Sequence, residues 1–168
     1  MIESMDPLWL SVARSYVGIT ETPGPASTAV ILNWAKDIQA PAYLNDGIAW
    51  CAVFINRLWM ACQMPMAGTG YDLLRAKASL TWGQPLPIPA LGAVLVFQRS
   101  EGGHVGLYCG ERADAYYVLG GNQGNAVSYV WIAKDRMVGC RWPAGRVLPL
   151  LTPVMVASDG ARLSVNEA

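Results

Sequence analysis

The sequence predicts an α+β fold in which helices come first along the chain and a small antiparallel sheet follows. In the first half, apolar residues recur at helical spacing, whereas the second half holds short β-branched and aromatic runs separated by turns. Because the two kinds of element are segregated, we expect the helices to pack on one face of the sheet. The 168 residues suffice for one domain, expected over residues 1–143, with 144–168 as a partly extended or disordered tail.

Four segments of the first half have helical patterning. The segment from Cys51 to Cys62 is apolar on most sides, which is typical of a helix at the centre of a domain. The helices are expected at 6–18, 28–39, 51–62 and 71–83.

Five strands are predicted in the second half. The turns between them are short, and hairpin-length links favour pairing of each strand with the next in an antiparallel meander. The strands are expected at 93–99, 104–111, 115–122, 126–133 and 137–142.

Composition excludes several classes of function. The 12 basic and 12 acidic side chains cancel, so there is no positive field for nucleic acid or an anionic membrane. The sequence lacks an uninterrupted apolar run of about 18 residues, so no membrane insertion is expected. The N-terminus lacks the basic region of a signal peptide. We therefore expect synthesis in the cytoplasm and release by another route.

Cysteine and histidine usage also restricts the chemistry. There is no CxxC pair among the four cysteines, and a single histidine, His104, cannot supply a mononuclear zinc site, so no metal is expected. A disulfide between Cys109 and Cys140 is compatible with neighbouring strands, and the sequence leaves it open.

Cys51 is the candidate nucleophile. It lies where the apolar helix begins, and the free N–H groups and macrodipole of a helix N-terminus favour a thiolate. Cys62 is at the opposite end of the same helix, where the dipole acts against a thiolate, so we interpret it as a packing residue.

His104 and Asn122 complete a candidate triad. His104 opens one predicted strand and Asn122 ends the next, and in an antiparallel pair these two positions share one edge of the sheet. An imidazole base needs a partner that fixes its tautomer, and the carboxamide of Asn122 is our candidate, with Gln123 adjacent to it. Cysteine, histidine and asparagine are the triad of papain-like enzymes.

Three segments, WCAVFIN, GGHVGLYCG and LGGNQGN, carry a family resemblance in that order. Together with GITETPG at residues 18–24, they resemble cysteine peptidases and amidases of the NlpC-like and CHAP superfamily, in particular a branch of small bacterial and prophage proteins. The resemblance covers about residues 8–143. Ala93 stands where the family commonly has an acidic residue, and NDGIAW differs from the usual lead into the cysteine.

The resemblance implies a papain-like fold and an endolysin-like hydrolase acting on peptidoglycan peptide or amide bonds, without cofactor. It assigns Cys51 as nucleophile, His104 as base and Asn122 as the third polar residue. Peptidoglycan or muropeptides would be the substrate, reached in the periplasm or cell wall after holin- or secretion-dependent release. An immunity protein, a phage tail or a holin would be compatible partners.

Four further residues near these motifs are candidates for substrate binding. Trp50 and Gln123 adjoin two of the catalytic positions, and Glu21 and Asp46 could bind the free amines of muropeptide stems. Solvated acids and core packing are the alternatives for these side chains, and the scatter of the seven tryptophans favours core packing for most of them.

Two other functions remain compatible with the sequence. One is a catalytically silent papain-like module that serves as a phage structural or wall-binding protein. The other is an acyltransferase or transglutaminase-like enzyme, in which an amine instead of water accepts the acyl group.

Overall fold

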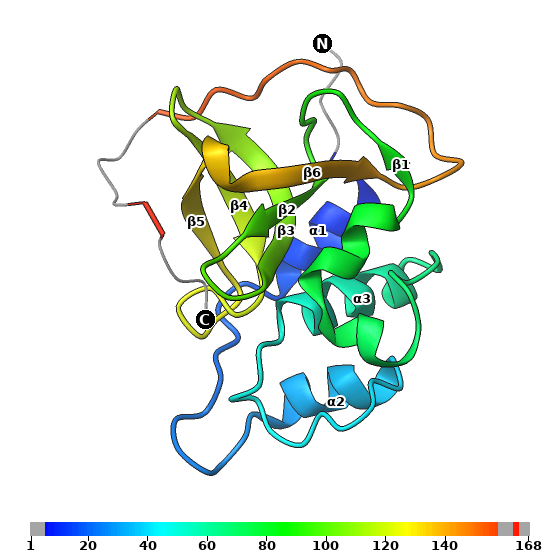
Figure 1. The fold of residues 1–168 in the computed structure, drawn as a ribbon, viewed down its shortest axis with the longest axis vertical. Helices are drawn as coiled ribbons and strands as arrows, with labels where there is room; N and C mark the ends of the chain where they lie inside the picture. The colour runs from blue at the N-terminus through cyan, green and yellow to red at the C-terminus, as the bar shows by residue number, and fades with distance from the viewer. Residues whose placement is uncertain (1–5, 158–162, 165–168) are drawn as a thin grey trace.

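The computed structural model describes residues 6–157 and 163–164 and has a mixed α+β architecture, as the sequence predicts (Figure 1). The helices lie to one side of the sheet, and α3 lies between α2 and the strands. The α-helices are α1 (Leu8–Ser15), α2 (Ala29–Asp37) and α3 (Cys51–Ala61). The strands are β1 (Gln84–Pro85), β2 (Val94–Gln98), β3 (Gly103–Glu111), β4 (Ala115–Gly120), β5 (Ser128–Ala133) and β6 (Met137–Trp142).

The fourth predicted helix is instead two 3-10 segments, η1 (Gly70–Leu74) and η2 (Ala76–Thr81), and a third, η3 (Lys134–Arg136), links β5 to β6. Leu73, Ala76 and Ser79 are buried, and their spacing of three matches the three residues per turn of a 3-10 helix. Arg75 between η1 and η2 has extended backbone angles. This extended residue separates the two 3-10 segments, and side chains from both of them line the pocket described below.

The predicted meander of five strands is wrong in two respects. The sheet has six strands in the order β1-β6-β2-β3-β4-β5, and the two-residue β1 was not predicted. Strands β2 to β5 pair consecutively, but β6 crosses the sheet to pair with β2, with Leu95 opposite Cys140 (Figure 1). The η3 turn redirects the chain after β5, so that β6 lies on the far side of β2, between β1 and β2.

The core forms where the helices meet the sheet, and α3 contributes eight of its buried residues. The indole of Trp59 stacks on Trp82 with ring centroids 4.3 Å apart, and Trp34 packs against Phe54. All seven tryptophans are buried, which confirms the prediction of core packing for most of them.

The chain after Trp142 turns at residues 144–146, and its next described part passes across the end of the sheet without forming a helix (Figure 1). The N–H of Glu111 donates to Val154 and its carbonyl accepts from Val156, at 2.7 and 2.9 Å. Further along, the N–H of Ser164 donates to Trp131 on β5. Among the described residues, no helix is both long and apolar enough to cross a membrane.

Candidate active site

Cys51 is the first residue of α3, as predicted, and its side chain is 3% exposed. Trp50 precedes it at the helix cap, and the first backbone bond of the helix runs from the N–H of Phe54 to the carbonyl of Trp50, at 2.9 Å. The N–H groups of Cys51 and Ala52 are therefore free of helical partners, and both favour a lower pKa of the Cys51 thiol. An anion that forms at this sulfur meets the positive end of α3.

The Cys51 thiol lies against β3 at Val105, the residue that follows His104 in the chain. The backbone N–H of Val105, the residue after His104, is hydrogen-bonded to the sulfur. Burial raises the pKa of the Cys51 thiol above its ordinary value, while the Val105 and Ala52 N–H groups and the charge of Arg99 oppose this rise without cancelling it. The helix N-terminus alone therefore does not lower the pKa of this thiol below its ordinary value.

His104 is fully buried on β3, opposite Phe97 of β2. Its Nε2 lies 2.9 Å from Oε1 of Gln123, while Nε2 of Gln123 donates to the carbonyls of Val118 and Ser128 at 3.1 and 2.5 Å. These two bonds fix the orientation of the carboxamide, so that its oxygen must accept from His104. The imidazole therefore carries its hydrogen on Nε2, and Nδ1 is the nitrogen that can take a proton.

The carboxamide that orients His104 is that of Gln123, whereas the sequence favoured Asn122. Asn122 is buried and has a left-handed φ of 59°, which turns the chain after β4 and directs the next side chain toward His104. The N–H of Gln123 also donates to Ala126, which closes the turn. A Cβ on Gly120 would lie 2.7 Å from Oε1 of Gln123, so the absence of a side chain there makes room for the contact.

Trp50 and Glu21, two of the predicted substrate-binding residues, bind each other. The Trp50 indole is fully buried and donates to Oε2 of Glu21 at 2.9 Å. This bond ties the loop after α1 to the start of α3. In this arrangement the ring of Trp50 cannot contact a substrate.

Asp46 organises the loop before α2. Its Oδ2 accepts from the N–H groups of Thr28 and Thr22 at 2.6 and 3.1 Å, and its side chain is 2% exposed. Thr28 is the cap residue of α2, so the carboxylate satisfies a free donor of that helix. Burial opposes ionisation of Asp46, but these hydrogen bonds outweigh it and lower the pKa of the carboxyl group.

Replacing Asp46 by asparagine should lower the free energy of unfolding by about 2 kcal/mol at pH 7, because charge-assisted bonds to two buried donors are weakened. The folded-state pKa lies below the unfolded value of about 3.9, so the ionised group contributes fully above that pH and its contribution disappears as pH falls through the folded pKa. Urea unfolding at pH 7 and pH 3 measures both effects. Equal unfolding energies for the two proteins at pH 7 would contradict the role of Asp46.

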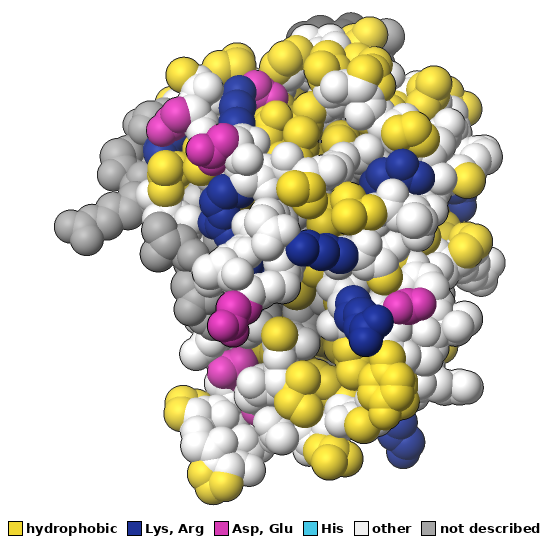
Figure 2. Space-filling model, in the orientation of Figure 1, with side chains coloured by type: hydrophobic (Ala, Val, Ile, Leu, Met, Phe, Trp, Pro, Cys, Tyr) yellow, Lys and Arg dark blue, Asp and Glu magenta, His cyan; other side chains and the backbone are white. Residues whose placement is uncertain are grey.

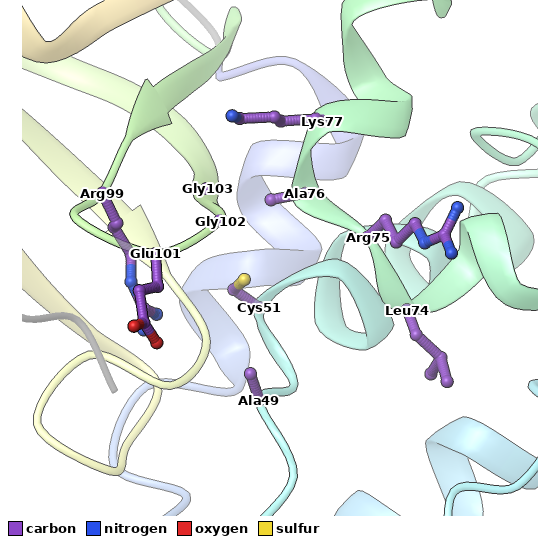
Figure 3. A pocket seen from close by; sticks show the side chains of 10 residues that line it. All are labelled: Ala49, Cys51, Leu74, Arg75, Ala76, Lys77, Arg99, Glu101, Gly102 and Gly103. Carbon is purple, nitrogen blue, oxygen red and sulfur yellow. The ribbon is translucent and has the colours of Figure 1, made fainter.

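A pocket of about 360 Å³ reaches the Cys51 thiol from the surface. Figure 3 shows the thiol between the β2–β3 loop on one side and the junction of η1 and η2 on the other. Leu74 and Ala76 contribute apolar lining, and Gly102 and Gly103 leave the loop side open. Trp50, Glu21, Asp46 and Gln123, the predicted substrate-binding residues, do not line this pocket.

The charged residues of the pocket were missed by sequence reasoning. They are Arg75, Lys77, Arg99 and Glu101. The sequence holds a weak signal for two of them. Arg99 and Glu101 stand just before the histidine motif in the chain, so a site at His104 would have these residues nearby.

All four cysteines are free thiols, so the Cys109–Cys140 disulfide that the sequence left open is not formed. Burial raises the pKa of both Cys109 and Cys140 to about 12, and it also raises that of Cys62. The pocket that contains Cys51 is lined by no other cysteine. Within the described part of the chain, no three side chains of the metal-binding types cluster together.

The sequence matches no protein-family model and no curated protein.

Proposed function

We propose that this protein is a papain-like cysteine hydrolase, of the NlpC-like and CHAP kind, that cleaves peptide or amide bonds of peptidoglycan. The observation that carries the proposal is the position of the Cys51 thiol at the start of α3, against Val105 of β3. Val105 follows His104, whose Nε2 lies 2.9 Å from Oε1 of Gln123. A pocket gives the same thiol access to the surface. The substrate class rests on the resemblance of the motifs.

In the proposed reaction, Nδ1 of His104 takes the thiol proton as the Cys51 sulfur attacks the carbonyl carbon. The N–H groups at the start of α3 stabilise the oxyanion of the tetrahedral intermediate. The imidazolium then protonates the leaving nitrogen, the carbon–nitrogen bond breaks, and a thioester remains on Cys51. Water, deprotonated by His104, attacks the thioester, which releases the carboxylate and restores the thiol.

Digestion of purified peptidoglycan by the full-length protein, with mass spectrometry of the released muropeptides, tests this proposal. The wild type should release defined fragments, and Cys51→Ala should lower the rate by at least about 10³-fold because it removes the nucleophile. Thermal unfolding shows that the variant is folded. Turnover by a folded Cys51→Ala protein at the wild-type rate would overturn the proposal, and so would intact peptidoglycan after incubation with the wild type.

The low exposure of Cys51 and its raised pKa are the observations that favour the other reading, a catalytically silent wall-binding module. The two readings differ in the expected reactivity of the thiol. A silent module should bind peptidoglycan without cleaving it, and its Cys51 should react with iodoacetamide no faster than a simple thiol does.

An acyltransferase would use the same thioester with a different acceptor. Adding glycinamide to the muropeptide digest distinguishes the two, because an acyltransferase should give the amide adduct as its main product. We expect the free carboxylate, the product of water attack.

A further inference from the structure

The β4–β5 turn, residues 121–127, pairs with the loop that follows α1 (Figure 1). Thr20 and Ala126 form an isolated antiparallel bridge, and the N–H of Val127 donates to Ile19 at 2.8 Å. These contacts involve the first part of the GITETPG segment, which no step of the proposed reaction uses. The turn that carries the orienting carboxamide is therefore held on one side by the loop after α1.

The same turn also packs on Trp50, the residue before Cys51. A Cβ on Gly121 would lie 2.8 Å from Cζ3 of Trp50 and 2.7 Å from Cβ of Phe54. The turn can lie directly against the start of α3 because Gly121 has no side chain. Trp34 of α2 packs on Trp50 with ring centroids 6.2 Å apart. The indole of Trp50 is therefore in contact with both α2 and the turn.

Glu21 connects these two contacts of the turn. Its backbone N–H donates to the carbonyl of Asn125, and Oε2 of its side chain accepts from the indole N–H of the fully buried Trp50, at 2.9 Å in each bond. A buried indole N–H needs an acceptor, and a charged acceptor forms the stronger bond. One residue therefore binds both the turn and the indole against which the turn packs.

The position of the turn decides which nitrogen of His104 carries the proton. The imidazole is fully buried and does not appear on the face shown in Figure 2, so protein groups rather than bulk water select its tautomer. Oε1 of Gln123 lies 2.9 Å from Nε2 of His104. A Cβ on Gly120 would lie 2.7 Å from that oxygen and 3.4 Å from that nitrogen. Packing is so close here that a displacement of the turn changes the bond to Nε2.

We propose that Glu21 and Trp50 are positioning residues of the candidate active site. By holding the β4–β5 turn in place, they keep Gln123 at the distance from His104 that fixes the Nε2–H tautomer. The described residues that line the Cys51 pocket include neither of them, so they act through the turn and not on a substrate. The effect on catalysis rests on the proposed hydrolase function, whereas the tautomer is a property of the folded protein alone.

Nitrogen NMR of the imidazole tests this inference without a substrate. Because His104 is the only histidine in the chain, isotope-labelled histidine in the untagged protein gives the signals of one ring. Long-range proton–nitrogen correlation spectra distinguish a protonated ring nitrogen from an unprotonated one. For the wild type we expect a proton on Nε2 and none on Nδ1 at about pH 8, above the ordinary pKa of histidine. A proton on Nδ1 of the neutral wild-type ring would overturn the inference.

Glu21→Ala removes the acceptor of the Trp50 indole and weakens the contact between the turn and α3. We expect the population of the Nδ1–H tautomer to increase at least about tenfold and kcat for a defined muropeptide to fall about tenfold, with KM unchanged. Glu21→Gln keeps an acceptor oxygen and should restore both values to within about threefold of wild type. Trp50→Phe keeps an aromatic ring against Gly121 but has no N–H, so it should shift the tautomer in the same direction as Glu21→Ala.

Asp114→Ala is the matched control, because it also removes a hydrogen-bonded carboxylate, which lies 2.8 Å from Nε of Arg112 in the turn between β3 and β4. Its tautomer and kcat should equal those of the wild type. A merely structural role of Glu21 would lower the thermal stability and leave the tautomer unchanged. That result, in a folded Glu21→Ala or Trp50→Phe protein, would overturn the inference.

Failure of this inference is distinguishable from failure of the proposed function. A shifted tautomer in Glu21→Ala, together with a wild type that leaves peptidoglycan intact, contradicts the hydrolase and supports the positioning of His104. A wild type that cleaves peptidoglycan, with an unshifted tautomer in Glu21→Ala, contradicts only the positioning. Thermal unfolding of each variant shows that it is folded.

Discussion

Replacing His104 by glutamine should lower the rate of peptidoglycan hydrolysis by about 10³-fold, because general acid–base catalysis is lost. Glutamine is polar and can accept or donate at a buried site, but it has no basic nitrogen for the Cys51 proton. Substrate binding should change little, because His104 does not line the pocket. The measurement is kcat and KM for a defined muropeptide, with the loss expected in kcat.

Folding must be separated from catalysis in this experiment, since His104 is fully buried. Circular dichroism and thermal unfolding of His104→Gln provide the control. A folded variant that retains more than a tenth of the wild-type kcat would contradict the role of His104 as base.

The second large effect is expected at Gln123. Changing it to alanine removes the bond to Nε2 of His104 and the two bonds to the carbonyls of Val118 and Ser128. Loss of the fixed tautomer should lower kcat by about 10²-fold, an effect of the size expected for a misplaced catalytic group. The free energy of unfolding should decrease by about 2 kcal/mol, because buried carbonyls lose their donors.

Asn122→Gly is the matched control for Gln123→Ala. Glycine adopts the left-handed φ of 59° without strain, so this variant removes the carboxamide and keeps the turn. We expect kcat within about threefold of the wild-type value, because the Asn122 side chain is not part of the hydrogen-bonded network of His104 and Gln123. A larger loss of kcat in Asn122→Gly than in Gln123→Ala would contradict the role of Gln123 and indicate Asn122 as the third residue of the triad.

Local patterns in the sequence predict much of the fold. The apolar periodicity of 51–62 and the β-branched runs of the second half place α3 and strands β2 to β6 within a few residues of their bounds. The pairing of β6 with β2 is a contact between distant segments, and no local pattern distinguishes it from a meander. Strand β1 has two residues, one of them proline, and so has almost no strand pattern.

The part of the candidate site that follows from the order of helices and strands was predictable from the sequence. The start of α3 meets the start of β3, which brings Cys51 to Val105, the residue after His104. The choice between Asn122 and Gln123 depends on one left-handed residue, and sequence pattern does not determine which neighbour turns inward. Lys77 and Arg99 belong to different segments of the chain, and both line the Cys51 pocket because η2 packs against β2 and β3.

Iodoacetamide alkylation of Cys51 across pH 5–10 in the wild type and in His104→Gln tests the activated thiol most directly. With His104 as proton acceptor, the wild-type thiol should react near neutral pH at least about tenfold faster than 2-mercaptoethanol. In His104→Gln, reaction should require alkaline pH, because burial raises the pKa of the thiol and no base remains. Wild-type Cys51 that reacts no faster than 2-mercaptoethanol, with the same pH dependence in His104→Gln, would contradict the account.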